Sequence, residues 1–340
     1  MEDAVLDKLV LNNFRCHKDY GLDLKPDTTL ILGENGCGKT SVLEAIYIAL
    51  RGKSFRAVDR EILKRDADFY RIELYYSDGE KIVVVYDGNK KSFLVKDKKT
   101  ARLPAKEKYP VVLFLPEDLH LVSTSPTKKR EYFDRVLAQL DSNYNISLLR
   151  YNKALKQRNE LLKQENVSAE MLFSWNILMA KYGVEIRKAR DKMINFINLE
   201  LTNTYHSIAD NDDEVTLDYK SYTGNTEESE YLKLLEMDFE RDRLTGHTNF
   251  GVHKDDYDFV FNNSLADGSA SRGEVRSMVL ALKFIEAREI FRTLGKKPVV
   301  LLDDVFSELD SMRQKSLVSN FRDHQVILTS VDGAGVNQAG

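Results

Sequence analysis

Near its N-terminus the chain reads Gly33-Glu34-Asn35-Gly36-Cys37-Gly38-Lys39-Thr40, which fits the pattern G-x-x-x-x-G-K-[ST] at every fixed position. The apolar run before it, 28–32, has the length of a buried strand, and the apolar run after it, 41–50, has that of a helix. Because the motif lies between a strand and a helix, we predict that it cradles the phosphates of a nucleoside triphosphate. The alternative is a glycine-rich turn that binds nothing.

Each residue type in this loop suits that chemistry. Glycines let successive backbone N–H groups approach the β- and γ-phosphates, Lys39 supplies a mobile positive charge, and Thr40 offers a hydroxyl to Mg²⁺. We therefore expect these contacts to ATP: Gly33, Glu34, Asn35, Gly36, Cys37, Gly38, Lys39, Thr40 and Ser41.

A second apolar run, 298–302, ends in the carboxylates Asp303 and Asp304. In phosphate-loop NTPases a strand beside the first presents an Asp that holds Mg²⁺, and we assign that role to Asp303. Asp304 would then face the water that attacks the γ-phosphate, as general base or orienting group. A strand followed by a solvated acidic turn is the alternative.

The composition sets limits on the class of protein. The chain has 340 residues, of which 42% are apolar and 31% charged, and only two cysteines, which make no disulfide framework or metal cluster. No apolar run approaches the ~20 residues that span a bilayer, and no signal-peptide pattern is present, so we expect a cytoplasmic protein without a membrane partner. The net charge of −4 means that any DNA contact must come from local basic patches.

The order of the expected elements suggests an α/β fold in two lobes. A strand at 8–15 with an antiparallel partner at 20–24 precedes the phosphate loop, and runs at 70–76, 81–87 and 92–96 predict a meander beside the nucleotide-binding strand. Long helical patterns follow at 125–141, 146–164 and 169–209. We expect an ATP-binding lobe made of 1–116 and 245–340, with a helical lobe, 117–244, inserted between them.

Two further motifs point to a dimer. The stretch 305–310, ending in Asp310, resembles the segment after the Mg²⁺ strand of ATP-binding-cassette proteins, and Ser271-Arg272-Gly273 opens a helix at the position of the cassette signature motif. A Ser hydroxyl and a Gly backbone at a helix N-terminus form an anion site. Such a site would complete the ATP pocket of a second subunit, with Ser271, Gly273 and Asp310 at the partner's nucleotide. A capped amphipathic helix is the alternative for Ser271.

The chain as a whole resembles the RecF family, bacterial recombination-mediator ATPases related to the heads of SMC and Rad50 proteins. The resemblance implies an ATP-binding-cassette type of phosphate-loop NTPase fold with an inserted helical lobe, and a weak, DNA-stimulated ATPase that uses ATP and Mg²⁺. The stretches that carry it, besides the phosphate loop, are 11–15, 43–47, 53–56, 116–119, 125–134, 151–159 and 301–310.

The resemblance also implies partners. ATP would drive a homodimer onto DNA at gaps or junctions, where it supports RecA loading with RecO and RecR, gap repair, replication and SOS induction. The chain departs from the family at 251–256, which reads Gly-Val-His-Lys-Asp-Asp instead of Gly-Pro-His-Arg-Asp-Asp. Thr329 stands where many cassettes place a switch histidine, and a final strand expected after Asp332 is missing from the short tail.

Two other functions remain as alternatives. A DNA tether of the SMC or Rad50 kind needs hundreds of residues of heptads, whereas we expect the insertion of roughly 130 residues to break into short helices. An ATPase subunit of a transporter would carry a conventional signature loop and a switch histidine, and neither is present.

Residues that contact DNA are harder to identify. The richest basic segment runs from Lys90 to Lys108 and contains only two acids, although a solvated hairpin face would have the same composition. No aromatic platform for stacking bases is evident, so we expect contacts to the phosphate backbone. The candidates are Lys53, Arg56, Lys98, Lys99 and Arg102.

Overall fold

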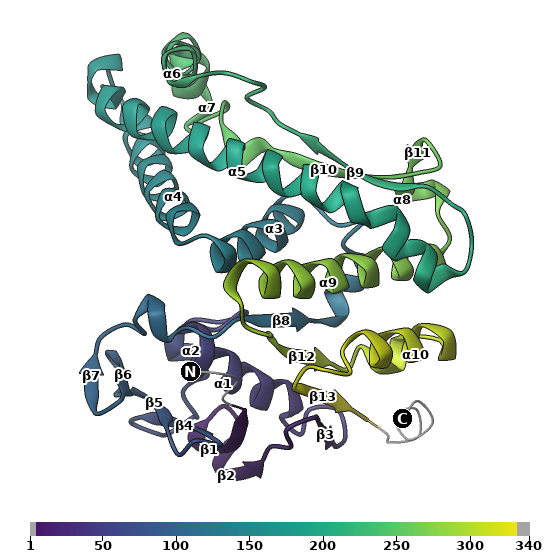
Figure 1. Cartoon of the computed structure of the whole chain (residues 1–340). Helices are drawn as coiled ribbons and strands as arrows, with labels where there is room; N and C mark the ends of the chain where they lie inside the picture. Colours follow the sequence, from purple (N-terminus) through teal and green to yellow (C-terminus); the bar gives the residue numbers. More distant parts are fainter. Residues whose placement is uncertain (1–4, 332–340) are drawn as a thin grey trace. The chain divides into compact units, whose positions relative to one another are not determined.

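The computed structural model describes residues 5–331, which form two compact units (Figure 1). Unit 1 contains 5–119 and 283–331, and unit 2 contains 120–282. The segment 245–282, which we expected in the ATP-binding lobe, belongs to unit 2, because its strand β10 (Asp256–Phe261) pairs with β9 (Val215–Lys220). The expected final strand lies outside the described residues. None of the described helices is long and apolar enough to cross a membrane.

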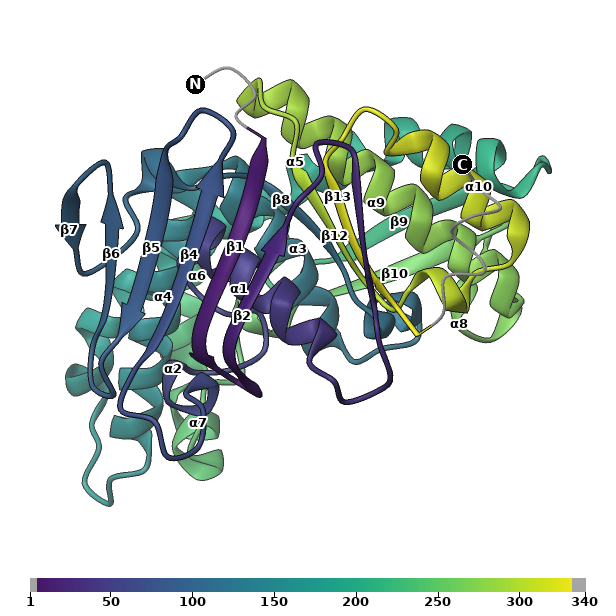
Figure 2. The same cartoon turned by 90° about the horizontal axis from the view of Figure 1, so that it is seen from below.

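Unit 1 contains a six-stranded antiparallel sheet in the order β2-β1-β4-β5-β6-β7, whose strands lie side by side in Figure 2. The expected antiparallel partner of the first strand and the expected meander are both confirmed. Alternating burial along β4 turns one face of this sheet to the core. The strands are β1 (Leu6–Phe14), β2 (His17–Asp23), β4 (Tyr70–Tyr76), β5 (Lys81–Tyr86), β6 (Lys91–Val95) and β7 (Lys98–Thr100).

A second sheet of unit 1 is parallel, in the order β3-β13-β12-β8. The nucleotide-binding strand β3 is therefore not part of the meander's sheet. We also expected the strand that ends in Asp303 to lie beside β3, and this was wrong, since β13 lies between β3 and β12 and pairs with both. The strands are β3 (Thr28–Leu32), β8 (Val111–Phe114), β12 (Val299–Asp303) and β13 (Val326–Ser330).

The helix α1 (Lys39–Arg51) makes the core of unit 1. Every residue from Ser41 to Leu50 is buried, and the surrounding apolar cluster takes side chains from both sheets. A helix that is apolar all round must be buried on all sides, which explains why it lies between two sheets. The other helical elements are α2 (Asp59–Ile62), η1 (Ala105–Glu107), η2 (Pro116–His120), η4 (Phe306–Glu308), α10 (Ser311–Asn320) and the unit-spanning α9 (Arg272–Leu294).

Unit 2 is mainly helical. Its longest helix, α5 (Ala169–Ala209), has 41 residues and is about 60 Å long. It confirms the helical pattern predicted at 169–209, and it is longer than the short helices that we expected against an extended coiled coil. This helix packs along α4, α6 and β9. The strand β9 was not expected, and it forms a three-stranded sheet with β10 and β11. The remaining elements are α3 (Pro126–Leu140), α4 (Ser142–Leu162), α6 (Glu228–Met237), α7 (Phe239–Thr245), η3 (Val252–Lys254), β11 (Ser264–Leu265) and α8 (Ala266–Ser269).

Candidate nucleotide site

The phosphate loop connects the end of β3 to the first residue of α1. Gly36 and Gly38 have φ angles of 85° and 102°, a region that side chains disfavour. A Cβ on Gly38 would lie 2.4 Å from the Sγ atom of Cys16 and 2.6 Å from the Nε2 atom of His17. Glycine is thus required at this position twice over, by the backbone angle and by the close approach of the β1–β2 turn.

Lys39 is buried, and its ammonium group lies over the loop. Its Nζ atom donates to the carbonyl oxygens of Gly33 at 2.8 Å and Glu34 at 3.3 Å. The same atom is 3.7 Å from the Oδ2 atom of Asp304. The positive charge therefore lies between the loop backbone and Asp304.

Thr40 meets Asp303 across the unit. The Thr40 hydroxyl lies 2.9 Å from both carboxylate oxygens of Asp303, and the hydroxyl of Thr329 donates to Oδ1 of Asp303 at 2.9 Å. Burial raises the pKa of Asp303, although the two threonine hydrogen bonds oppose that shift. A Thr hydroxyl beside a carboxylate is the oxygen donor set that suits Mg²⁺.

At Asp304 the backbone leaves the extended conformation of β12, which ends at Asp303. Asp304 has a φ of 49°, which lies in the left-handed region, and its N–H donates to the Thr329 hydroxyl at 2.9 Å. Its Oδ1 atom is buried and has no hydrogen-bond partner within residues 5–331. A buried carboxylate oxygen without a donor is costly, so this atom is suited to accept a hydrogen bond from a water molecule in the cavity.

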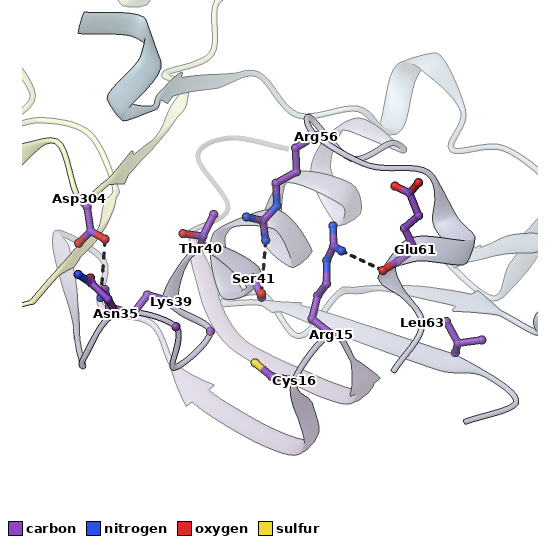
Figure 3. Close-up of a pocket in the computed structure, with 12 residues that line it drawn as sticks. Arg15, Cys16, Asn35, Lys39, Thr40, Ser41, Arg56, Glu61, Leu63 and Asp304 are labelled. Atoms are coloured by element: carbon purple, nitrogen blue, oxygen red, sulfur yellow. Dashed lines mark hydrogen bonds and ion pairs between the residues drawn. The ribbon is translucent and has the colours of Figure 1, made fainter. Parts of the chain in front are cut away.

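A cavity of about 440 Å³ joins these groups (Figure 3). It brings together Asp304 and six of the nine loop residues expected at ATP, and it adds five residues from the segments 15–16 and 56–63. Gly33, Glu34, Cys37 and Asp303 are not among the residues that line it. The lining residues are Arg15, Cys16, Asn35, Gly36, Gly38, Lys39, Thr40, Ser41, Arg56, Glu61, Leu63 and Asp304.

Two arginines in this cavity share one buried carboxylate. Arg15 and Arg56 both bind Glu44, which is fully buried on α1, at 2.9 Å. Burial alone would raise the pKa of Glu44, but hydrogen bonds from Arg15, Arg56 and Ser54 outweigh it and lower the pKa. Arg56, expected among the DNA contacts, thus lies at the nucleotide cavity, where its Nη2 atom is 3.4 Å from the Ser41 hydroxyl.

Sequence reasoning gave Arg15 no role in the site. The available signal was its place directly after the opening strand, in the turn that the structure brings to the phosphate loop. Glu44 was equally hard to identify, because a single acid within an apolar helix does not reveal which cations it meets.

The two motifs expected to act across a dimer both lie at helix N-termini. Ser271 caps α9 in a capping box, in which the Glu274 N–H donates to the Ser271 hydroxyl at 3.3 Å and the Ser271 N–H donates to the Glu274 carboxylate at 2.6 Å. Gly273 lies in the first turn of α9. Asp310 caps α10 by accepting from the Arg313 N–H at 3.0 Å. The role of these residues toward a partner stays a prediction.

The remaining candidates for DNA contact are on the surface of unit 1. Lys98 and Lys99 are exposed on β7, Arg102 is exposed in the loop after it, and Lys53 is exposed after the C-terminus of α1.

Comparison with known proteins agrees with the fold and with ATP binding. A family model described as AAA ATPase domain matches residues 5–311. The DNA replication and repair protein RecF of Clostridium perfringens is 33% identical, over 94% of this chain and 91% of its own length. The protein of the same name from Ruminiclostridium cellulolyticum is 32% identical, over 96% of this chain and 92% of its own length.

Solved structures give the same result. The recombination mediator protein RecF with ATPrS, from the RecFOR pathway, superposes with a TM-score of 0.87 at 27% identity, covering 97% of this chain and 93% of that one. The same protein with ATP gives a TM-score of 0.85. An SMC head bound to the C-winged helix domain of ScpA, at 15% identity and a TM-score of 0.53, shares the fold alone.

Proposed function

The chain belongs to the RecF family of DNA replication and repair proteins, and from this membership we propose that it is an ATP-driven switch that dimerises on DNA. One observation carries the nucleotide part of the proposal. Lys39 and Thr40 come from the opposite end of the chain to Asp303 and Asp304, yet polar atoms of Thr40 and Asp303, and of Lys39 and Asp304, lie within 4 Å of each other. Lys39, Thr40 and Asp304 line the cavity, and Asp303 is bonded to Thr40.

ATP and Mg²⁺ fit the groups that line this cavity. The phosphate loop offers backbone N–H groups at a helix N-terminus, and Lys39 adds a charge that can move from the Gly33 and Glu34 carbonyls to phosphate oxygens. No cluster of three or more His, Cys, Asp or Glu side chains suited to a metal is found in the described part of the chain. Mg²⁺ would therefore be held by Thr40 and Asp303 together with phosphate oxygens and water, and it would neutralise charge on the β- and γ-phosphates.

For hydrolysis, the residue proposed to act on water is Asp304. Its Oδ1 atom would accept a hydrogen bond from the attacking water and so orient the water's lone pair toward the γ-phosphorus. Lys39, already 3.7 Å from Oδ2 of Asp304, would hold the carboxylate in place. Slow hydrolysis stimulated by DNA would make ATP a timer for the dimer.

The dimer would form two composite sites. Ser271 is exposed at the N-terminus of α9, and its hydroxyl proton is not used by the capping box, because that hydroxyl acts there as an acceptor. Ser271, Gly273 and Asp310 would meet the γ-phosphate bound by the partner subunit.

DNA would be bound through its phosphate backbone in the cytoplasm. The relatives' names support a role in DNA replication and repair. The similar RecF of known structure acts in the RecFOR pathway, which supports RecO and RecR as partners, with RecA acting downstream. A tether of the SMC or Rad50 kind is disfavoured within residues 5–331, because the longest helix, α5, packs along its own unit instead of extending as an arm.

The test is an ATPase assay with and without duplex DNA, combined with sizing with and without ATP. We expect hydrolysis to be slow and to rise with DNA, and the dimer to form with ATP only. Lys39→Ala should abolish both responses while circular dichroism stays unchanged. The proposal would be contradicted if the protein stayed monomeric in the presence of ATP, or if the rate of hydrolysis were the same with and without DNA.

A further inference from the structure

The loop 101–109 wraps the C-terminal end of α1. The Tyr109 N–H donates to the carbonyl oxygen of Leu50 at 3.1 Å, and Arg51 Nη1 donates to the carbonyl oxygen of Tyr109 at 3.3 Å. A Cβ on Gly52, which ends α1 with a φ of 83°, would lie 3.2 Å from Leu103 Cβ. Segments about 50 to 60 residues apart in sequence are thus held together by hydrogen bonds to the backbone and by close packing.

This contact gathers positive charges. Arg51 and Lys53 flank Gly52, and Lys108 directly precedes Tyr109. Burial lowers the pKa of Lys108, and the charges of Arg51 and Lys53 lower it further. The three cations therefore lie near enough to repel one another, and an anion bound there would be attracted by all three.

On its other side, Lys108 borders a shallow hollow. Five lysines line it, together with Tyr76, Ile82, Val95 and Tyr109 on the apolar side and the acids Glu80 and Glu107. Its volume of about 30 Å³ has room for water but not for a small-molecule ligand. The lysines therefore form a charged surface and do not line a ligand pocket. Those lysines are Lys81, Lys96, Lys106, Lys108 and Lys296.

Local pairing accounts for part of this charge. Lys81 binds Glu73 at 3.1 Å, and Glu107 lies 3.7 Å from Lys96 and 3.9 Å from Lys106. The C-terminal dipole of α1 favours Arg51 and Lys53. Lys296 also lies over the Tyr109 ring, with its Nζ atom 5.7 Å from the ring centroid. The two acids at the hollow, Glu80 and Glu107, are still outnumbered by its five lysines, so an excess of positive charge remains there.

We propose that Arg51, Lys53, Lys106, Lys108 and Lys296, named here the α1-end surface, bind the phosphate backbone of DNA. A row of separate cations without a cavity suits a polyanion with repeated charges better than a single small anion. The inference rests on the proposed DNA-binding function and names its contact surface. Because the same buried helix carries the phosphate loop at one end and this surface at the other, about 20 Å apart, DNA bound here acts on the element that holds ATP.

The test replaces three of these lysines in the full-length protein: Lys53→Gln/Lys106→Gln/Lys108→Gln. Affinity for a fluorescent duplex is measured by anisotropy over a range of salt concentrations. Each lost phosphate contact should reduce the slope of log affinity against log salt by about 0.9, so we expect a slope flatter by up to about 2.7 and weaker binding. DNA-independent ATP hydrolysis should stay at the wild-type rate, since these lysines are outside the nucleotide cavity.

The matched control is Lys153→Gln/Lys156→Gln/Lys163→Gln, which removes three exposed lysines from α4 and the residue after it, and it should keep the wild-type slope. A second comparison, Lys98→Gln/Lys99→Gln, tests the β7 hairpin. Lys108 is partly buried, so its substitution could prevent folding of the triple variant. In that case Lys53→Gln/Lys106→Gln replaces it, and the slope of log affinity against log salt should flatten by up to about 1.8.

The outcomes separate this inference from the proposed function. The inference is overturned if the wild type binds duplex DNA and the triple lysine variant keeps the wild-type slope of log affinity against log salt. If only the Lys98→Gln/Lys99→Gln variant changes that slope, the DNA contact lies at β7. If the triple lysine variant keeps its DNA slope but loses binding to an acidic protein partner, the surface is a protein interface and the inference is also overturned. A wild type that does not bind DNA would contradict the proposed function itself.

Discussion

Thr40 and Asp303 are 263 positions apart in the sequence, yet the Thr40 hydroxyl lies 2.9 Å from both oxygens of the Asp303 carboxylate. The strand β13 lies between the strands that precede them, and its Thr329 completes the arrangement. The Thr329 hydroxyl donates to Asp303 and accepts from the Asp304 N–H. A strand that separates the two motifs in the sheet thus fixes the orientation of both acids.

Removing the charge of Asp303 should stabilise the nucleotide-free protein. Because burial raises its pKa, the ionised carboxylate costs free energy of folding at neutral pH. Asp303→Asn keeps an oxygen for Thr40 and Thr329, so we expect Tm at pH 7 to rise by roughly 1–2 °C, the shift for about 1 kcal/mol in a chain of 340 residues. The sign follows from the raised pKa: the gain shrinks as the pH falls and wild-type Asp303 takes up a proton. Thermal unfolding without nucleotide at pH 7 and pH 4 measures it.

The same variant should lose Mg²⁺-dependent binding of ATP, because the amide oxygen is a weaker ligand than a carboxylate. Asp323→Asn is the matched control, since Asp323 is exposed and does not line the nucleotide cavity. A fall in Tm for Asp303→Asn, together with unchanged Mg²⁺ dependence, would show that this carboxylate serves the fold and not the metal.

Asp304→Asn should separate binding from hydrolysis. The substitution keeps the volume but weakens the acceptor that faces the attacking water, so we expect hydrolysis to fall by about 10²-fold or more while ATP still binds and the dimer persists. Single-turnover hydrolysis and sizing with ATP measure the two effects.

A nearby control is Glu308→Gln, which changes an exposed carboxylate in the adjoining η4 turn. Its hydrolysis rate should match that of the wild type. Wild-type turnover in Asp304→Asn itself would remove this residue from the chemistry, and Glu117, at the start of η2, would be the next to substitute.

The motifs predicted more of the site than of the fold around it. The phosphate loop and the acidic pair each lie within one short segment, so their spacing alone predicted Lys39, Thr40, Asp303 and Asp304, which the structure brings together. The strand order could not be predicted the same way, because which of several apolar runs lies beside β3 depends on how the chain returns from unit 2. Arg15 and Glu44 were missed for the same reason, since their pairing is made by packing between distant segments.

The segment 251–256 gains a structural role that its sequence did not reveal. His253 accepts from the Tyr151 hydroxyl at 2.8 Å through Nδ1 and donates through Nε2 to the Thr248 carbonyl at 3.1 Å. Asp255 binds Arg190 at 2.7 Å and accepts from the Tyr222 N–H at 2.8 Å. These contacts hold unit 2 together, so the motif is a packing centre within it.

His253 should make the protein sensitive to acid. Burial lowers the pKa of His253 to about 4. Between pH 6.5 and pH 4, the histidine is therefore protonated in the unfolded chain but neutral in the folded chain. Stability from this residue is therefore complete above pH 6.5 and is lost as the pH falls toward 4, by on the order of 3 kcal/mol. Urea unfolding at several pH values should show a shallower decline for His253→Gln than for the wild type.

The comparison for that experiment is His247→Gln, which removes an exposed histidine six residues away. Its unfolding free energy should follow the wild-type pH dependence. If the unfolding free energy fell equally with pH in the wild type and in His253→Gln, other groups would be responsible for the acid sensitivity.

Ser271 gives the most direct test of ATP-driven dimerisation. Ser271→Arg places a bulky cation at the exposed N-terminus of α9, where the partner's γ-phosphate is proposed to lie. The cavity around Lys39, Thr40 and Asp303 is untouched, so ATP should still bind the monomer. Dimerisation and hydrolysis should be lost. Glu274→Ala controls for the weakened helix cap, because it removes the other half of the capping box without adding bulk, and it should still dimerise.

The decisive measurement mixes Ser271→Arg with Lys39→Ala, each inactive alone, and follows ATP hydrolysis as the ratio is varied. Only a heterodimer pairs the intact phosphate loop of one chain with the intact signature helix of the other. We predict that activity reappears, with a maximum near equal amounts of the two. If Ser271→Arg alone still dimerises with ATP as the wild type does, or if no mixture recovers hydrolysis, the composite-site account is contradicted and the chain acts as a monomeric switch.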